Sequence, residues 1–284
     1  MGNVFDAMKK HEEEQVQQAA QRRLALEKDR AAAPAGGGGG ASETATAAAV
    51  AEAPQSIDGY SRALAVHHDR GGRLAEQYRM LRTNLLAQCP SQRFCMITTS
   101  AEATEGKSVT CLNLALALAE SQDRRVLVID GDLRRPGVAR LLRVEEAPGL
   151  AEVLRGEVRP AEALRQTLYA NVSVLCAGRA GPEEFGLLLG KPELEEMIAD
   201  WRRRHDFVLI DTPPVQTASD AIILGRLAGE ALLVVRMHKT RCDSVDRAIR
   251  LLRAANVKIG GLVLTHEKYM APGYLYPYAY RYRA

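Results

Sequence analysis

The residues best suited to chemistry in this sequence are a Gly-Lys-Ser triplet and three aspartates that follow apolar runs. Gly106, Lys107 and Ser108 end the segment Ala101-Glu102-Ala103-Thr104-Glu105-Gly106-Lys107-Ser108. Such a segment can bind a phosphate chain. Its backbone N–H groups face the anion, the lysine reaches the outer phosphates, and the hydroxyl holds Mg²⁺. The triplet therefore predicts a site for ATP and Mg²⁺.

The segments on either side of the triplet predict the structure that such a site requires. Residues 94–100 are apolar and β-branched, as in a buried strand, and residues 109–119 read as a helix packed on most sides. A strand, a tight loop and a helix in this order are the context of a P-loop. The first glycine of the usual pattern is replaced by Ala101, and the alternative is an ordinary strand-to-helix turn. The expected nucleotide contacts are Thr104, Glu105, Gly106, Lys107, Ser108 and Val109.

Two aspartates lie at the end of the second predicted strand. Asp130 and Asp132 flank Gly131, so their side chains point the same way while the chain stays extended. Paired carboxylates beside a phosphate loop suit Mg²⁺ binding and general-base chemistry. The alternative is a solvated turn in which an aspartate caps a helix.

A third aspartate, Asp211, closes the apolar run Phe207-Val208-Leu209-Ile210 and precedes Thr212-Pro213-Pro214. An aspartate in this position is the Walker B arrangement, which holds Mg²⁺ directly or through water. Burying a lone carboxylate for structure alone would be costly. We therefore expect Asp211 to belong to the metal site.

From residue 94 onward, predicted strands and helices alternate. The strands are continuous apolar runs, which indicates that both faces of the sheet are covered. We predict an α/β fold of the P-loop NTPase type, with a mostly parallel sheet, helices on both faces, and ligands beyond the carboxyl ends of the strands. The expected strands are 94–99, 125–130, 172–175, 206–211, 231–236 and 259–264. The expected helices lie near 73–86, 107–120, 136–142, 150–155, 160–168, 183–203, 218–228 and 241–255.

The bulk properties are those of a soluble globular protein, with 46% hydrophobic and 26% charged residues. A net charge of +3 is too small to indicate nucleic-acid binding. The five cysteines are scattered, which favours buried thiols in a reducing compartment. No apolar run approaches the ~20 residues of a membrane span, and the N-terminus lacks the apolar core of a signal peptide. We expect a cytoplasmic protein that reaches the membrane only through a partner.

Composition divides the chain into four parts. Residues 1–30 favour a helix that is either a docking segment or a solvated helix, and 31–57 are an Ala/Gly-rich flexible linker. Residues 58–268 form the predicted catalytic domain. Residues 269–284 form a predicted disordered tail. This tail contains six of the nine tyrosines, Tyr269, Tyr274, Tyr276, Tyr278, Tyr280 and Tyr282. A tail of phenols beside an ATP site suggests phosphoryl acceptors.

A charged stripe on the helix at 73–86 has two interpretations. Glu76, Arg79 and Arg82 are spaced i, i+3, i+6. Such a stripe is usually a solvated face. The alternative is an interface that joins copies of the chain.

From about residue 74 to the C-terminus, the sequence resembles the bacterial tyrosine kinases of capsule and exopolysaccharide synthesis, relatives of the partition and septum-site ATPases. The similarity rests on Gly106-Lys107-Ser108 (Walker A), residues 128–136 (Walker A′), residues 208–214 (Walker B), the Glu76-x-x-Arg79-x-x-Arg82 helix and the tyrosine tail. Many members carry Pro-Gly where this chain has Ala103-Thr104, and Thr265 stands where relatives often have Asn.

The resemblance implies ATP-dependent autophosphorylation of the tail in trans, within a homo-oligomeric ring. It also implies control of polysaccharide chain length and export, and a separate membrane activator protein. A phenol has a pKa of roughly 10 and needs a base at neutral pH, for which Asp130 is the candidate. Lys107 and a Mg²⁺ ion held by Ser108, Asp132 and Asp211 would neutralise the phosphates.

Two other functions fit parts of the sequence. The first is an ATPase of the ParA or MinD type, which hydrolyses ATP without a protein acceptor. Such ATPases carry a second lysine early in the loop, at the position of Ala101, and lack a tyrosine tail. The second is a catalytically weak nucleotide-binding scaffold that docks on a membrane partner, consistent with the departures in the loop.

Overall fold

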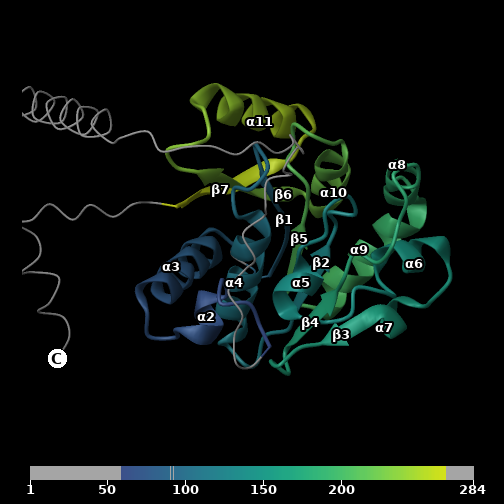
Figure 1. Cartoon of the computed structure of the whole chain (residues 1–284), viewed down its shortest axis with the longest axis horizontal. Helices are drawn as coiled ribbons and strands as arrows, with labels where there is room; N and C mark the ends of the chain where they lie inside the picture. Colours follow the sequence, from purple (N-terminus) through teal and green to yellow (C-terminus); the bar gives the residue numbers. More distant parts are fainter. Residues whose placement is uncertain (1–58, 90, 92, 267–284) are drawn as a thin grey trace, which may run out of the picture. The chain divides into compact units, whose positions relative to one another are not determined.

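The computed structural model describes residues 59–89, 91 and 93–266 (Figure 1). The predicted N-terminal helix, the linker and the tyrosines of the tail lie outside these residues. Within the described part of the chain, no helix is long and apolar enough to cross a membrane.

The described strands form one sheet in the order β3-β4-β2-β5-β1-β6-β7. Neighbouring strands run parallel, except that β3 is antiparallel to β4. This confirms the predicted α/β fold with a mostly parallel sheet. The strands are β1 (Phe94–Ser100), β2 (Val126–Asp130), β3 (Leu164–Gln166), β4 (Val172–Leu175), β5 (Phe207–Asp211), β6 (Glu230–Arg236) and β7 (Lys258–Thr265).

Helices cover both faces of the sheet, because successive side chains of each buried strand point to opposite sides. Met96 of β1 packs into the core under α3, α4 and α5, whereas its neighbours Cys95 and Ile97 pack into the core under α6 and α8–α11 (Figure 1). The helices are α2 (Ala65–His68), α3 (Arg73–Gln88), α4 (Lys107–Ala119), α5 (Val138–Leu142), α6 (Leu150–Arg155), α7 (Pro160–Ala163), α8 (Phe185–Leu189), α9 (Pro192–Arg204), α10 (Asp220–Ala228) and α11 (Cys242–Ala254).

Two predicted helices were wrong in extent. The helix expected at 160–168 ends at Ala163, and the chain continues as β3, whose residues pair with β4 across a turn. The hydroxyl of Thr167 donates to the carbonyls of Tyr169 and Val172 and holds that turn. The pairing with β4 is a tertiary contact that overrides local helix propensity.

The helix expected at 183–203 is two helices, α8 and α9, separated by Gly190 and Lys191. Pro192 begins α9, because proline suits the first turn of a helix and disfavours helical geometry in the residue before it. The short helix α2 was not predicted.

Candidate nucleotide-binding site

The predicted P-loop connects β1 to α4. Residues 101–106 form the loop, and Lys107 is the first residue of the helix. Gly106 caps this helix with φ +93°, a left-handed conformation that glycine adopts without a steric penalty. Thr104 also has a positive φ, +64°. The loop therefore has left-handed geometry at Thr104, a β-branched residue, as well as at Gly106.

The two predicted aspartate motifs, at the ends of β2 and β5, meet the P-loop at the same end of the sheet, because β5 lies between β1 and β2. Asp211 at the end of β5 is in register with Thr98 of β1 on one side and with Asp130 of β2 on the other. The topology thus brings Lys107 and the three aspartates together, although about 100 residues separate Lys107 from Asp211 in the sequence.

Asp130 is completely buried and its carboxylate is held by backbone donors. Its Oδ2 accepts hydrogen bonds from the N–H groups of Gly137 and Val138, each at 3.0 Å, and its Oδ1 accepts one from Asp132 at 3.2 Å. These bonds fix the carboxylate and fold the segment after β2 back over it.

Asp132 forms an ion pair with the P-loop lysine. The Nζ of Lys107 lies 2.9 Å from Oδ2 of Asp132, and Oδ1 of Asp132 accepts a hydrogen bond from the N–H of Arg135 at 3.0 Å. The aspartate motif after β2 therefore contacts the P-loop lysine directly.

Asp211 differs from the other two aspartates because its carboxylate is buried without a hydrogen bond. The residue is 0% exposed, and neither oxygen has a partner within hydrogen-bond geometry. The hydroxyl of Ser108 and the N–H of Thr212 lie close enough to oppose a rise in the pKa of Asp211, but neither is positioned to donate a hydrogen bond to its carboxylate. A buried carboxylate whose oxygens lack partners favours a cationic ligand.

The electrostatics of the site also favour a cation. Burial raises the pKa of Asp130, and the nearby carboxylate of Asp211 raises it further. Burial likewise raises the pKa of Asp211, although Lys107 opposes this rise. Burial alone would lower the pKa of Lys107, but Asp211, Asp132 and Asp130 together outweigh burial and raise it. One ammonium group therefore faces three carboxyl groups.

The residues present fit Mg²⁺ bound together with a nucleotide. Ser108 offers a hydroxyl, and Asp211 offers a carboxylate whose oxygens have no hydrogen-bond partner. Among the residues that the structure describes, no group of three or more His, Cys, Asp or Glu side chains is placed to hold a metal ion alone. Mg²⁺ usually keeps water ligands and binds through one or two carboxylates plus substrate phosphates. The candidate site matches that pattern.

Sequence reasoning missed three groups that shape the site. Gly137 lies against the P-loop, since a Cβ built at this position would be 3.0 Å from Oγ of Ser108. Arg134 forms a bidentate ion pair with the buried Asp220 of α10, at 2.8 and 3.1 Å. Thr240 hydrogen-bonds the carboxylate of Glu105. The glycine after Pro136 was the one signal available in the sequence, and the other two pairs link distant segments.

The charged stripe of α3 is occupied within the chain. Arg79 and Arg82 both bind Glu120, the C-cap residue of α4, at 2.7 and 2.8 Å, and Arg79 also pairs with Glu76 at 3.1 Å. Partial burial alone would raise the pKa of Glu120, but the hydrogen bonds from the two arginines lower it. The stripe therefore links α3 to the end of the helix that begins at Lys107.

Comparison with known proteins identifies a family and several relatives. Residues 93–274, more than half of the chain, match a family model described as "ParA: NUBPL iron-transfer P-loop NTPase". The chain is 35% identical over 202 residues to tyrosine-protein kinase ptk of Acinetobacter johnsonii, covering 70% of this chain and 27% of that protein. It is 34% identical over 195 residues to tyrosine-protein kinase YwqD of Bacillus subtilis, covering 68% of this chain and 81% of that protein.

Two solved structures are similar to this chain in fold and in sequence. The kinase domain of the Escherichia coli tyrosine kinase ETK has a TM-score of 0.67 and 28% identity, with 75% of this chain and 84% of that chain covered. The cell-division ATPase MinD of Pyrococcus furiosus has a TM-score of 0.53 and 30% identity, with 60% and 71% covered. The chain spans less than a third of the length of the first two kinases that it matches in sequence.

Proposed function

We propose, since this chain belongs to the bacterial tyrosine-protein kinases within the P-loop NTPases, that it transfers the γ-phosphoryl group of ATP to tyrosine side chains. The observation that carries the proposal is the convergence of Lys107, Asp132 and Asp211 behind the P-loop, in a chain similar to named tyrosine kinases. The proposed acceptors are the tail tyrosines of a neighbouring copy, Tyr269, Tyr274, Tyr276, Tyr278, Tyr280 and Tyr282.

Asp130 acts as the general base in this proposal. It takes the phenolic proton as the oxygen–phosphorus bond forms, and the bond to the departing ADP breaks. Burial and Asp211 raise the pKa of Asp130, which brings its basicity closer to that of the phenol. Its hydrogen bonds to Gly137 and Val138 hold the carboxylate in place.

Lys107 and the metal ligands neutralise charge. Lys107 would bind the β- and γ-phosphates, and Ser108, Asp132 and Asp211 would hold Mg²⁺ directly or through water. Mg²⁺, when bound, neutralises charge on the transferring phosphoryl group. Positioning and charge neutralisation dominate because the transition state of phosphoryl transfer is loose.

The remaining expectations belong to the same proposal. Copies of the chain form a ring through the helix that carries Glu76, Arg79 and Arg82. A membrane protein of polysaccharide export activates the ring, so the chain works as a cytoplasmic protein at the inner membrane and controls chain length and export. Similarity to the putative tyrosine-protein kinase CapB of Staphylococcus aureus supports this context.

One assay tests the proposal. The purified chain is incubated with Mg-ATP, with and without the cytoplasmic peptide of a candidate membrane partner, and probed for phosphotyrosine. We expect weak labelling that the peptide increases, and no labelling when the six tail tyrosines are replaced by phenylalanine. A chain that never gains phosphotyrosine under either condition contradicts the proposal.

A second candidate function is ATP hydrolysis of the MinD type, favoured by the structural similarity to MinD. In that case the same reaction releases inorganic phosphate without labelling tyrosine. A chain that binds nucleotide but gives neither product is a scaffold. Position 101 holds alanine and not the second lysine of MinD-type ATPases, which favours the kinase over the ATPase.

A further inference from the structure

The P-loop carries a buried carboxylate of its own. Glu105 is 1% exposed, although it lies within a loop whose purpose is to bind an anion. Its Oε2 accepts a hydrogen bond from the N–H of Glu102 at 2.9 Å, and its Oε1 accepts one from the hydroxyl of Thr240. Its backbone carbonyl accepts a third, from the hydroxyl of Thr265 at 2.7 Å. The side chain is thus anchored to the start of its own loop and to the loop between β6 and α11.

The neighbouring residue, Thr104, is held from the same direction. Its φ of +64° is an outlier for a β-branched side chain. The ammonium group of Lys239 donates to the Thr104 hydroxyl at 3.1 Å, and Arg236 approaches its carbonyl at 3.4 Å. Two basic side chains from the end of β6 and the following loop therefore contact a β-branched residue with a left-handed backbone.

The first half of the P-loop is also tied to this region. The hydroxyl of Ser244, in the first turn of α11, donates to Oε1 of Glu102 at 2.8 Å. The amide of Gln216 donates to the carbonyl of Ala101 at 3.3 Å and to that of Ser244 at 2.7 Å. We call Lys239, Thr240 and Ser244 the loop clamp.

We propose that the loop clamp positions the P-loop for nucleotide binding, with Thr240 as its central residue. A phosphate site needs backbone N–H groups that converge on one point. Thr104 of this loop has a left-handed φ that glycine would adopt freely, so side-chain contacts hold the shape instead. Without the Thr240 hydroxyl, the Glu105 carboxylate keeps only the hydrogen bond from the N–H of Glu102 and can turn toward the phosphates.

The inference concerns nucleotide binding, and it rests on the proposed function only through the P-loop. The test measures the dissociation constant of Mg-ADP by calorimetry. Thr240→Val removes the hydroxyl at nearly constant volume and should weaken binding about tenfold, as expected for a buried carboxylate that loses a partner. Thr240→Ser should restore binding to within about twofold. The control is Thr83→Val, because Thr83 donates only to a carbonyl of its own helix.

Kinetics separate positioning from general destabilisation. In wild type and Thr240→Val, the KM for ATP should rise with the dissociation constant while kcat at saturation stays within about threefold. A loss of kcat alone, or unchanged binding in Thr240→Val, overturns the proposal.

A second pair of variants applies if Thr240→Val does not fold. Glu105→Leu removes both carboxylate contacts and should weaken Mg-ADP binding, whereas Glu105→Gln keeps an acceptor for Glu102 and a donor for Thr240 and should recover most of it. Equal weakening in both variants means that binding depends on the negative charge of Glu105 and not on its hydrogen bonds, and the clamp is then wrong. If wild type binds Mg-ADP with this pattern but never forms phosphotyrosine, the clamp stands and the kinase proposal fails.

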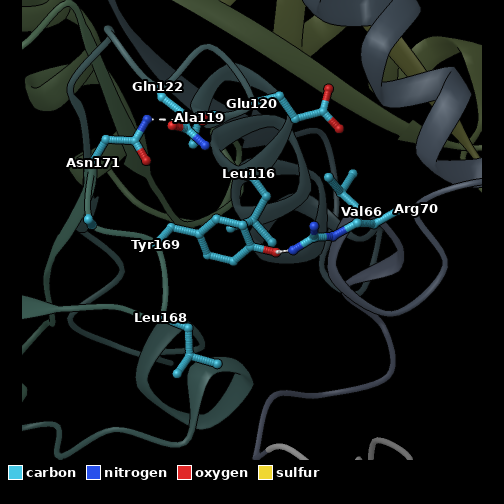
Figure 2. A pocket seen from close by; sticks show the side chains of 10 residues that line it. Val66, Arg70, Leu116, Ala119, Glu120, Gln122, Leu168, Tyr169 and Asn171 are labelled. Atoms are coloured by element: carbon cyan, nitrogen blue, oxygen red, sulfur yellow. Dashed lines mark hydrogen bonds between the residues drawn. The ribbon is translucent and has the colours of Figure 1, made fainter.

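A cavity of about 460 Å³ is lined in part by Arg70, Glu120, Tyr169 and Asn171 (Figure 2). Arg70 already donates to the Tyr169 hydroxyl, and Asn171 to the carbonyl of Ala119. Nothing in these contacts indicates a ligand.

Discussion

The ammonium nitrogen of Lys107 lies 2.9 Å from Oδ2 of Asp132, across the end of β5. Both side chains are nearly shielded from water, with 14% and 3% exposed. The lysine is therefore charged and oriented toward the site before a nucleotide arrives. Phosphate oxygens have to share it with Asp132 or displace that carboxylate.

Replacing this lysine should abolish phosphoryl transfer. Lys107→Met removes the cation that faces the phosphates, so we expect phosphotyrosine formation to fall by at least about 10²-fold. The measurement is the initial rate of tyrosine labelling by Mg-ATP. The control is Lys258→Met, whose lysine pairs with Glu230 at the sheet edge at 3.0 Å and is 65% exposed. Undiminished labelling in Lys107→Met would contradict a P-loop kinase.

Asp130→Asn should reduce the rate of transfer by about 10²- to 10⁴-fold while Mg-ATP still binds, because an amide cannot accept the phenolic proton. Single-turnover labelling and a nucleotide-binding titration measure the two effects separately. Asp123→Asn is the control, since that carboxylate is 80% exposed and has no proposed role in the site. Equal rates in the two variants would remove Asp130 as the base.

The pH profile gives an independent check on the base. Burial and Asp211 raise the pKa of Asp130, and only the ionised carboxylate accepts a proton. The rate should therefore rise with pH over a range above that of an ordinary aspartate, and the rise should disappear in Asp130→Asn. A rate that is constant from about pH 5 to pH 8 is incompatible with this assignment.

Asp211→Asn should stabilise the nucleotide-free protein while abolishing transfer. Burial raises the pKa of Asp211 in the folded state. The protonated side chain therefore stabilises the fold at low pH, and this contribution is lost as pH rises through the folded pKa. The amide of the variant does not ionise and has no such loss. We expect its free energy of unfolding to exceed that of wild type by ~1 to 2 kcal/mol, or a few degrees in Tm, and this gain should be larger at pH 8 than at pH 5.

Thermal unfolding at the two pH values measures this gain. The control is Asp206→Asn, because Asp206 already accepts a hydrogen bond from the N–H of Arg125 at 2.9 Å and pairs with Arg93 at 3.2 Å. That variant should lose stability. If Asp211→Asn also loses stability, its carboxylate has a structural partner and is not held ready for a metal ion.

The contact of Glu120 with Arg79 and Arg82 leads to a prediction about assembly. If a neighbouring copy binds these arginines, it competes with Glu120, so Glu120→Ala should strengthen the oligomer and the triple variant Glu76→Ala, Arg79→Ala, Arg82→Ala should dissociate it. Light scattering on unphosphorylated protein measures the mass, with Arg253→Ala as the control.

Phosphorylation should also dissociate the oligomer. Each phosphate adds about −1.5 to −2 charges, and several phosphates on one tail repel each other and the carboxylates of Asp130, Asp132 and Asp211. If the unphosphorylated, phosphorylated and triple-variant proteins all have the same mass, α3 is not an interface and its arginines serve only to bind Glu120.

The sequence by itself determined the P-loop, the two aspartate motifs and the parallel sheet, because each depends on short-range patterns. An apolar run followed by aspartate, or by a loop and Gly-Lys-Ser, predicts both a strand and the group at its end. The prediction that Asp130, Asp132 and Asp211 meet Lys107 needed only the rule that ligands bind at the carboxyl ends of parallel strands.

Tertiary structure decided which partners these groups have. Glu120 binds Arg79 and Arg82, and Thr240 hydrogen-bonds Glu105, although these residues lie far apart in the chain. The antiparallel pairing of β3 with β4 likewise depends on tertiary contacts. Asp211 shows the physical reason most directly. Its position at a strand end could be read from local sequence, but its burial without a hydrogen bond depends on how several distant segments pack around it.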